Sequence, residues 1–210
     1  MSSDKMIESQ RELISTLAAI FFISGFSALI YQVCWQRLLF TGFGVDLTSV
    51  TIIISIFMVG LGMGAFYGGR MADKFKENTI FIFCLIELLI GVFGFFSSKL
   101  ILLLQDHFVY SSILKISFLN FILLLFPTFL MGSTLPLLTS FFNRFLNNVG
   151  ESIGVLYFYN TLGAGFGALG TGFIFFNYIG LSQTIYIAAT LNMIVAISGF
   201  IIYGKYNEKL

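Results

Sequence analysis

The sequence is poor in the residue types that metal and redox chemistry need. Among 210 residues there are two cysteines, Cys34 and Cys84, and a single histidine, His107. Zinc, haem and iron–sulfur sites draw most of their ligands from these two residue types. Both cysteines lie within apolar runs, where a thiol acts as a small hydrophobic side chain. We therefore expect no metal, no cofactor and no disulfide bond.

Charged residues are also scarce. They make up 10% of the chain and the formal net charge is +1, whereas soluble domains carry about 25% charged residues. A basic stripe that could follow a phosphate backbone is missing, which argues against nucleic-acid binding. Hydrophobic residues, by contrast, make up 58% of the sequence and aromatic residues 18%. A globular core of this length cannot bury so much apolar surface, so the expected partners are the lipid bilayer, other helices and small solutes.

Long apolar segments dominate the chain. A membrane-spanning helix needs about 20 mainly apolar residues, and several segments approach this length. They are Leu13–Val33, Ser49–Tyr67, Thr79–Phe96, Ser117–Leu138, Ile153–Phe176 and Leu181–Tyr203. The polar breaks between them are too short for a soluble domain. The sequence predicts an all-α polytopic membrane protein with about six transmembrane helices in residues 13–203, a cytoplasmic N-terminal segment at 1–12 and a cytoplasmic tail at 204–210.

The positions of lysine and arginine predict the orientation, because positive charge is retained on the cytoplasmic side. With the N-terminus inside, Arg37, Lys99 and Lys115 are outside and all other basic residues are cytoplasmic. The cytoplasmic set is Lys5, Arg11, Arg70, Lys74, Lys76, Arg144, Lys205 and Lys209. We expect both ends of the chain in the cytoplasm and the protein in the inner (cytoplasmic) membrane of a bacterium.

Small residues recur every four positions in the second and fifth segments. They are Gly60, Gly64 and Gly68 in one segment and Gly163, Gly167 and Thr171 in the other. Such faces let helix backbones approach closely, so we interpret them as helix-packing faces. The two segments are the middle helices of successive triplets. This arrangement favours a 3+3 inverted repeat, like the one nested in half of a major-facilitator transporter.

Glu87 is the acidic residue that lies deep within an apolar segment. At 1.5 Å rise per residue it is roughly 12 Å from the start of its segment, where a bare carboxylate is costly and commonly has a partner or a function. Counting inward from the cytoplasmic ends puts Asn160, Thr161, Ser133 and Thr134 at a similar depth. We predict a polar layer there, which either locks helices together or binds a substrate or proton.

The outer end of the first segment carries Tyr31, Gln32, Trp35, Gln36 and Arg37. Gln32, Trp35 and Gln36 share one helix face, and Tyr31 is expected to stack one turn below Trp35. An interfacial anchor explains the tryptophan and the arginine. The two glutamines favour a polar pocket or a helix contact, and both interpretations stay open.

Two prolines, Pro127 and Pro136, bracket Met131, Gly132, Ser133 and Thr134 in the fourth segment. Each proline removes a backbone hydrogen bond and bends the helix. The freed carbonyls then need hydroxyl groups or a solute as partners. The pattern predicts either a structural kink or a broken helix that lines a cavity.

Four runs of the sequence resemble a known family. They are SGFSALIYQVCWQRLL at 24–39, FMVGLGMGAFYGGRMADKF at 57–75, PTFLMGSTLPLL at 127–138 and GVLYFYNTLGAGFGALGTGF at 154–173. They resemble the membrane domain of spermidine synthase-like fused membrane proteins, and the resemblance covers nearly the whole chain. It implies a helical arrangement similar to half of a major-facilitator transporter. In that family a soluble aminopropyltransferase-like domain commonly follows the membrane domain.

The stretch from Gly69 to Lys74 also resembles the start of the major-facilitator loop between helices two and three. The resemblance would give Asp73 a gating role, through pairing with charges and a helix N-terminus. However, Lys76 stands where that motif has glycine, so a basic cluster that fixes topology is an equally good account. Gln32 stands where many relatives have glutamate, which weakens a proton-coupling role at that position.

Only residues 204–210 follow the last apolar segment, so we expect this chain to lack the transferase domain and enzyme activity. The leading hypothesis is binding or transport of a small solute, with a second copy or another membrane subunit completing the cavity. The alternative is an accessory or anchoring subunit for a separate cytoplasmic aminopropyltransferase-like enzyme or a larger membrane complex. Transport predicts that Glu87, Asn160 and Thr134 face a water-accessible cavity, whereas a structural subunit predicts that they are packed and paired.

Overall fold

The computed structural model describes residues 3–44, 46–108 and 110–207, and places their side chains except at residues 3–10, 43, 46, 113 and 205–207. These ranges are helical almost throughout and contain no strand. The elements are α1 (Ser3–Phe43), α2 (Asp46–Lys74), the short 3-10 helix η1 (Lys76–Asn78), α3 (Thr79–His107), α4 (Ile113–Leu146), α5 (Val149–Gly170), the π-helical turn η2 (Thr171–Phe175), α6 (Phe176–Tyr178) and α7 (Leu181–Asn207). The predicted all-α class is confirmed for the described ranges.

Each predicted apolar segment lies within a helical stretch, and the helices extend beyond it. The first predicted segment, Leu13–Val33, is the middle of a helix that already begins at Ser3. Apolarity marks the part of a helix that can face lipid, but helix formation continues through polar residues at both ends. Residues 208–210 of the predicted tail and residues 1–2 of the N-terminal segment lie outside the described residues.

Local signals end the helices where the sequence becomes polar. Asn147 ends α4 in the left-handed conformation, with φ 48°, which asparagine tolerates better than most residues. The side chain of Asn148 then caps α5 by accepting a hydrogen bond of 3.2 Å from the backbone N–H of Glu151. The turn after α1 uses Gly44, whose φ of 66° favours glycine.

Five helical stretches are long and apolar enough to cross a membrane. They are Arg11–Gly42, Leu47–Lys74, Lys76–His107, Leu114–Leu146 and Leu181–Gly204. The chain is therefore consistent with an integral membrane protein, but with five candidate spans where the sequence had suggested about six.

The remaining predicted segment, 153–176, is helical through α5, η2 and α6 but is not one of the five candidate spans. Tyr157, Tyr159, Asn160 and Thr161 follow one another closely in α5, and together with its glycines they lower its apolar character. In the π-helical turn, the hydroxyl of Thr171 donates a hydrogen bond of 2.7 Å to the carbonyl of Gly167.

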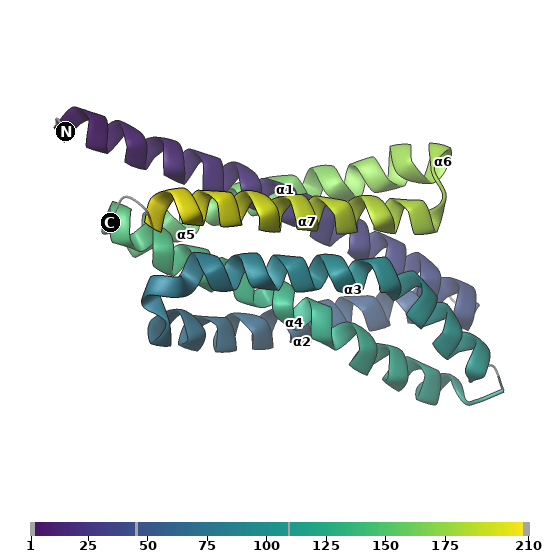
Figure 1. Ribbon diagram of the computed structural model, residues 1–210. Helices are drawn as coiled ribbons and strands as arrows, with labels where there is room; N and C mark the ends of the chain where they lie inside the picture. Colours follow the sequence, from purple (N-terminus) through teal and green to yellow (C-terminus); the bar gives the residue numbers. More distant parts are fainter. Residues whose placement is uncertain (1–2, 45, 109, 208–210) are drawn as a thin grey trace.

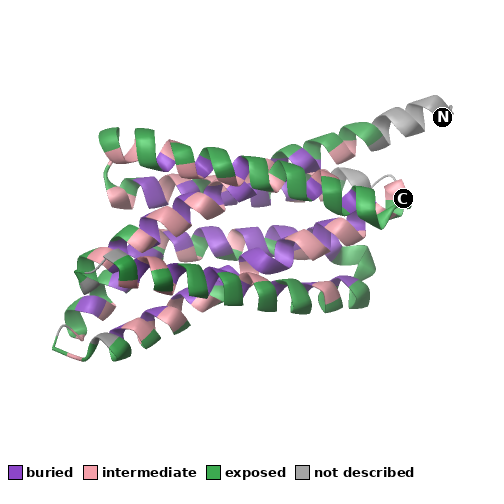
Figure 2. Ribbon diagram, turned by 180° about the vertical axis from the view of Figure 1, so that it is seen from behind, coloured by how far each residue is buried: buried purple, intermediate pink, exposed green. Residues whose placement is uncertain are grey.

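The helices form a bundle in which α1, α3 and α5 run in one direction and α2, α4 and α7 in the other (Figure 1). The most extensive interfaces join α2 to α4, α1 to α5 and α3 to α7, and smaller ones join α1 to α7 and α3 to α4. The start of α1 and the end of α7 lie at the same end of the bundle (Figure 1). Buried residues face the interior and exposed residues cover the outer surfaces (Figure 2).

Two clusters of buried side chains make up the core. One is centred on Tyr31 and Trp35 of α1 and includes Ile56 of α2 and Ile90 of α3. The other lies nearer the start of α1 and includes the edge-to-face pair Phe21 and Phe83, whose ring centroids are 6.3 Å apart. The glutamate that the sequence singled out lies on α3, one of the helices that contribute to both clusters.

Small residues hold α2 and α5 close to their partners. A Cβ atom on Gly64 would collide with the backbone carbonyl of Phe129 in α4, and one on Gly167 would collide with the carbonyl of Phe26 in α1. The other members of the two faces are also buried: Gly60 and Gly68 lie against Thr128 and Ser133 of α4, and Gly163 lies against Phe22 of α1. The backbones approach closely because these positions have no side chain.

Candidate functional site

Glu87 is fully buried where α1, α3 and α7 meet. The hydroxyl of Ser24 in α1 donates a hydrogen bond of 2.5 Å to carboxyl atom Oε1. The amide Nδ2 of Asn192 in α7 donates one of 2.5 Å to Oε2. Both carboxyl oxygens therefore have a neutral donor, and a single side chain ties three helices together.

Glycines on α3 make room for this contact. Glu87, Gly91 and Gly94 are spaced i, i+4 and i+7, so they share one face of the helix. A Cβ atom on Gly91 would lie 3.4 Å from Cβ of Asn192, and one on Gly94 would collide with the hydroxyl of Tyr31. The two glycines thus leave room along this face of α3 for two side chains, Asn192 of α7 beside Gly91 and Tyr31 of α1 beside Gly94.

Two buried polar atoms at these places have no hydrogen-bond partner among the described residues. They are Oδ1 of Asn192 and the hydroxyl of Tyr31. The side chains of both residues are almost completely buried. Buried polar atoms normally find partners, and an unpaired one costs about 1–3 kcal/mol. The cluster around Glu87 is therefore incomplete as it stands.

Polar contacts continue from this cluster along the interface of α1 and α3. Trp35 stacks on Tyr31 with ring centroids 4.9 Å apart and an interplanar angle of 24°, as expected from the sequence. Its Nε1 donates a hydrogen bond of 3.0 Å to the hydroxyl of Ser97. Farther along, Nε2 of Gln105 donates to the carbonyl of Leu38 at 3.1 Å. The buried tryptophan is a helix contact, because both its ring and its N–H meet other side chains.

The other residues at the end of α1 are less enclosed. Gln32 and Gln36 are half-buried, and Gln36 has an interaction of its own. Arg37 is exposed, with its guanidinium carbon 5.3 Å from the centroid of the Phe40 ring. None of these three side chains makes a hydrogen bond to Glu87, whose donors are Ser24 and Asn192.

The structure does not bring the predicted polar layer together around Glu87. Asn160 of α5 donates a hydrogen bond of 3.2 Å to the backbone carbonyl of Phe21, and Thr161 is exposed on the outer face of α5. Counting residues gave a depth in the bundle but no direction around the helix axis. Since α5 packs mainly against α1 and α4, its polar side chains do not reach the α3 carboxylate.

The polar residues near the two prolines of α4 are paired within their own helix. The hydroxyls of Thr128, Ser133 and Thr134 donate to backbone carbonyls three or four residues earlier, at 2.7 to 3.1 Å. Pro127 and Pro136 lie inside a single continuous helix. These hydroxyls satisfy backbone carbonyls, which fits a structural role rather than a cavity lining.

Asp73 lies exposed near the end of α2, beside the exposed Lys74 and Lys76. The guanidinium carbon of the neighbouring Arg70 sits 3.8 Å from the centroid of the Phe66 ring.

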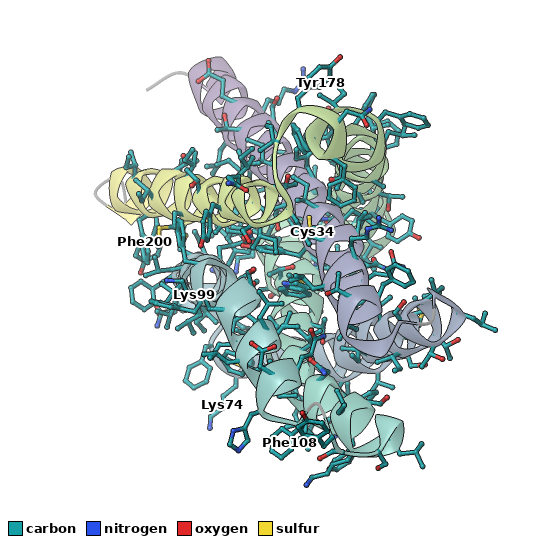
Figure 3. All side chains as sticks on the ribbon, turned by 90° about the vertical axis from the view of Figure 1, so that its right-hand side faces the viewer. Cys34, Lys74, Lys99, Phe108, Tyr178 and Phe200 are labelled. Carbon is teal, nitrogen blue, oxygen red and sulfur yellow. The ribbon has the colours of Figure 1, made fainter. Side chains whose placement is uncertain are left out.

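Figure 3 shows Lys74 at the edge of the bundle and Cys34 inside it. Both cysteines are free and buried. In the described part of the chain, no three His, Cys, Asp or Glu side chains come together.

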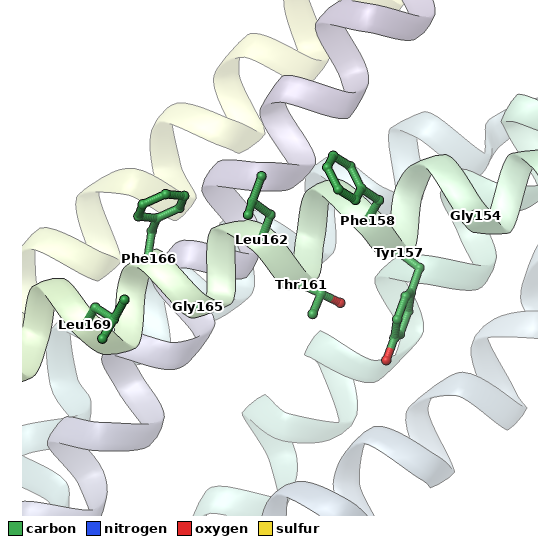
Figure 4. A pocket seen from close by; sticks show the side chains of 8 residues that line it. All are labelled: Gly154, Tyr157, Phe158, Thr161, Leu162, Gly165, Phe166 and Leu169. Atoms are coloured by element: carbon green, nitrogen blue, oxygen red, sulfur yellow. The ribbon is translucent and has the colours of Figure 1, made fainter.

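A separate groove of about 510 Å³ runs along the outer face of α5. Its lining extends from Gly154 to Leu169 and is mostly apolar, with Thr161 near the middle (Figure 4). None of the residues around Glu87 lines it. The groove is open on the outside of the bundle, whereas the carboxylate is enclosed within it.

Sequence reasoning identified Glu87 but missed both of its hydrogen-bond donors. Asn192 could have been found, because it is the asparagine in the middle of the last apolar segment, where an amide side chain is as unusual as a carboxylate. Ser24 carried no comparable signal, since serines are common on helix-packing faces.

The chain is similar to a polyamine aminopropyltransferase of Oceanobacillus iheyensis. The two are 26% identical over 197 residues, which is 94% of this chain and 36% of the relative. The chain thus spans about a third of the length of the curated relative that it matches. No protein-family model matches the chain, and no solved structure matches it.

This similarity overturns the expectation that the chain is not an enzyme. The relative that matches nearly the whole chain is named as an enzyme. The expectation was wrong because it was inferred from the small number of residues after the last apolar segment, which does not decide whether the chain belongs to an enzyme. The comparison gives weak similarity to a polyamine aminopropyltransferase in a helical chain of membrane-like composition, and supports the spermidine synthase-like resemblance in part.

Proposed function

We propose that this chain is the membrane-embedded module of a polyamine aminopropyltransferase-like enzyme. The observation that carries the proposal is the extent of the match, which takes in 94% of this chain but 36% of the relative. The similarity therefore falls on the apolar helices. In this proposal the helices hold the enzyme at the membrane, and the aminopropyl transfer takes place on residues beyond the helical bundle.

The packing of the polar residues favours this function over a solute pathway within the chain. Glu87 is 0% exposed and both of its oxygens are paired. Thr134 is buried and bonded to its own helix, and Asn160 is bonded to a backbone carbonyl. Packed and paired side chains are expected of a structural module, whereas a transport site needs polar groups that face water.

The proposal includes six crossings with both ends in the cytoplasm of a bacterium. Besides the five candidate spans, the helical stretch from α5 to α6 supplies one more crossing, which is the fifth along the chain. It packs on one side against α1 and α4. The start of α1, the end of α7 and the connections after α2 and α4 lie at one end of the bundle (Figure 1). Arg70, Lys74, Lys76 and Arg144 are near these connections, which supports a cytoplasmic position.

A 3+3 inverted repeat is also part of the proposal. If α1 corresponds to α4, α2 to α5 and α3 to α7, the α2–α4 pair of one triplet corresponds to the α5–α1 pair of the other, and the α3–α7 pair corresponds to itself. These are the three most extensive helix pairs. The close approaches follow the same exchange: Gly64 of α2 meets α4 as Gly167 of α5 meets α1. Gly132 of α4 meets Leu61 of α2 as Gly25 of α1 meets Asn160 of α5. This correspondence supports two equivalent triplets of helices.

Cell fractionation tests the proposal. In cells that make the chain, aminopropyltransferase activity is expected in the membrane fraction, and removing α1 to α7 should move it to the soluble fraction. Deleting only residues 205–210 should leave the distribution unchanged. An aminopropyltransferase activity that stays wholly soluble in the presence of the chain would contradict the proposed anchoring.

A further inference from the structure

We infer that Glu87, Asn192 and Ser24 form an enclosed binding site for a small monovalent cation, either a proton or an alkali-metal ion. The site lies among α1, α3 and α7 and goes beyond the proposed anchoring function, on which it does not depend.

The first argument is a charge that the protein itself does not balance. Ser24 and Asn192, which donate to the two oxygens of Glu87, are both neutral. An isolated carboxylate away from water is very costly, so a buried one is neutralised or paired. A cation bound beside the carboxyl group supplies the missing positive charge.

No basic side chain is placed to do this. Lysine, arginine and histidine are absent from residues 12–36 of α1, 79–98 of α3, 116–143 of α4 and 181–204 of α7. The titratable groups on the helices packed around Glu87 at this depth are Tyr31, Cys34 and Cys84, and all three are buried and neutral when protonated. The compensating charge must therefore come from outside the chain.

The second argument is the pair of unpartnered atoms. Oδ1 of Asn192 and the hydroxyl of Tyr31 can both accept, and neither has a partner among the described residues. Their places on α3, beside Gly91 and Gly94, lie four and seven residues beyond Glu87, which is roughly 6 and 10 Å along a helix. Asn192, which also donates to Glu87, is therefore the nearer of the two to the carboxyl group. The carboxylate of Glu87 on α3, the amide oxygen of Asn192 on α7 and the hydroxyl of Ser24 on α1 make a set of hard oxygen ligands, which suits a proton or an alkali ion rather than a soft transition metal.

The enclosure of the site limits the size of the ligand. The side chains around the site are 0% exposed at Glu87 of α3 and at Ser27 and Tyr31 of α1. The groove on α5 does not reach them. A bulky amine or sugar does not fit between the helices without separating them. A single small cation, by contrast, fits beside oxygen atoms that already line the contact.

The test measures thermal unfolding of the purified chain in detergent as sodium replaces choline at constant ionic strength, and separately as pH is lowered without sodium. Binding to the folded state raises its stability, so the wild-type Tm should rise by at least ~3 °C in one of the two series. Glu87→Gln should abolish that dependence. Asn120→Leu is the matched control, because Oδ1 of this buried asparagine also has no partner in the described part of the chain, while its Nδ2 donates to its own helix rather than to a carboxyl group. Its dependence should equal that of the wild type.

The two series separate the two cations. A rise with sodium identifies an alkali-metal site. A rise with acid, together with an infrared band of a protonated carboxyl group that Glu87→Gln lacks, identifies a proton site. If Glu87→Gln does not fold, Ser24→Ala replaces it, since it removes one oxygen beside the carboxyl group and should raise the cation concentration for half-maximal stabilisation at least about threefold. Responses to both sodium and pH that are the same in wild type and in these variants would overturn the inference.

Discussion

At the scale of single residues, Glu87 acts as the tie between three helices. Its oxygens accept from Ser24 on α1 and Asn192 on α7, each at 2.5 Å. Hydrogen bonds to a carboxyl group in a region without water contribute to helix association, because the alternative is an unpaired polar group in an apolar environment. The sequence could identify the glutamate by its depth, but the choice of partners depends on helix rotation, which only the packing defines.

Replacing Glu87 with leucine should destabilise the folded chain more than replacing it with glutamine. Leucine removes both acceptors and leaves the donors of Ser24 and Asn192 buried and unpaired, at a cost of about 1–3 kcal/mol. Glutamine keeps one acceptor oxygen. Thermal unfolding in mild detergent measures the difference. Thr190→Val serves as the control, since this exposed hydroxyl bonds only to its own helix, and an equal loss for Glu87→Leu and Thr190→Val would contradict the role of the glutamate.

At the scale of helices, the spacing of small residues predicted which elements approach closely. Gly64 and Gly167 meet backbone carbonyls of α4 and α1, as the four-residue spacing suggested. The partner helices were not predictable, because the pattern gives a face of one helix and not the identity of its neighbour. The lower apolar character of α5 was also visible in Tyr157 and Asn160, although the sequence analysis counted α5 with the other spans.

Leucine at Gly64 or Gly167 should strongly destabilise the bundle. The colliding atoms are backbone carbonyls, which cannot move aside as a flexible side chain can, and overpacking costs about 1–3 kcal/mol or more. Gly62→Leu and Gly165→Leu are the matched controls on the same helices, because a Cβ atom there meets nothing within 4 Å. The melting temperature of the purified variants provides the comparison, and equal effects at the two kinds of position would exclude the close packing described here.

At the scale of the whole molecule, the fold class and the positions of the long helices followed from apolar length and polar breaks, although the helices extend beyond the apolar segments. The five candidate spans agree with predicted segments. The functional conclusion did not follow in the same way, since the connection to an aminopropyltransferase rests on similarity to a longer protein. No arrangement of residues within the helices identifies that chemistry.

The proposed orientation predicts which end of the bundle faces the cytoplasm. A cysteine introduced at Asp106 should react with a membrane-impermeant thiol reagent in intact cells, whereas one at Lys76 should react only after permeabilisation. Both positions are exposed, and the native cysteines are buried, so background labelling is expected to be low. Labelling of Lys76→Cys in intact cells would reverse the orientation.

The central claim is that these helices belong to a membrane-bound polyamine aminopropyltransferase-like enzyme. Its most direct test is to capture the chain from detergent-solubilised membranes by an affinity tag and to measure aminopropyl transfer to a polyamine by the captured material. The account predicts that activity is retained with the chain, and that it is lost from the capture when Gly64→Leu and Gly167→Leu together disrupt the bundle. Captured chain that is folded and complete with its partners, yet transfers no aminopropyl group, would contradict the account.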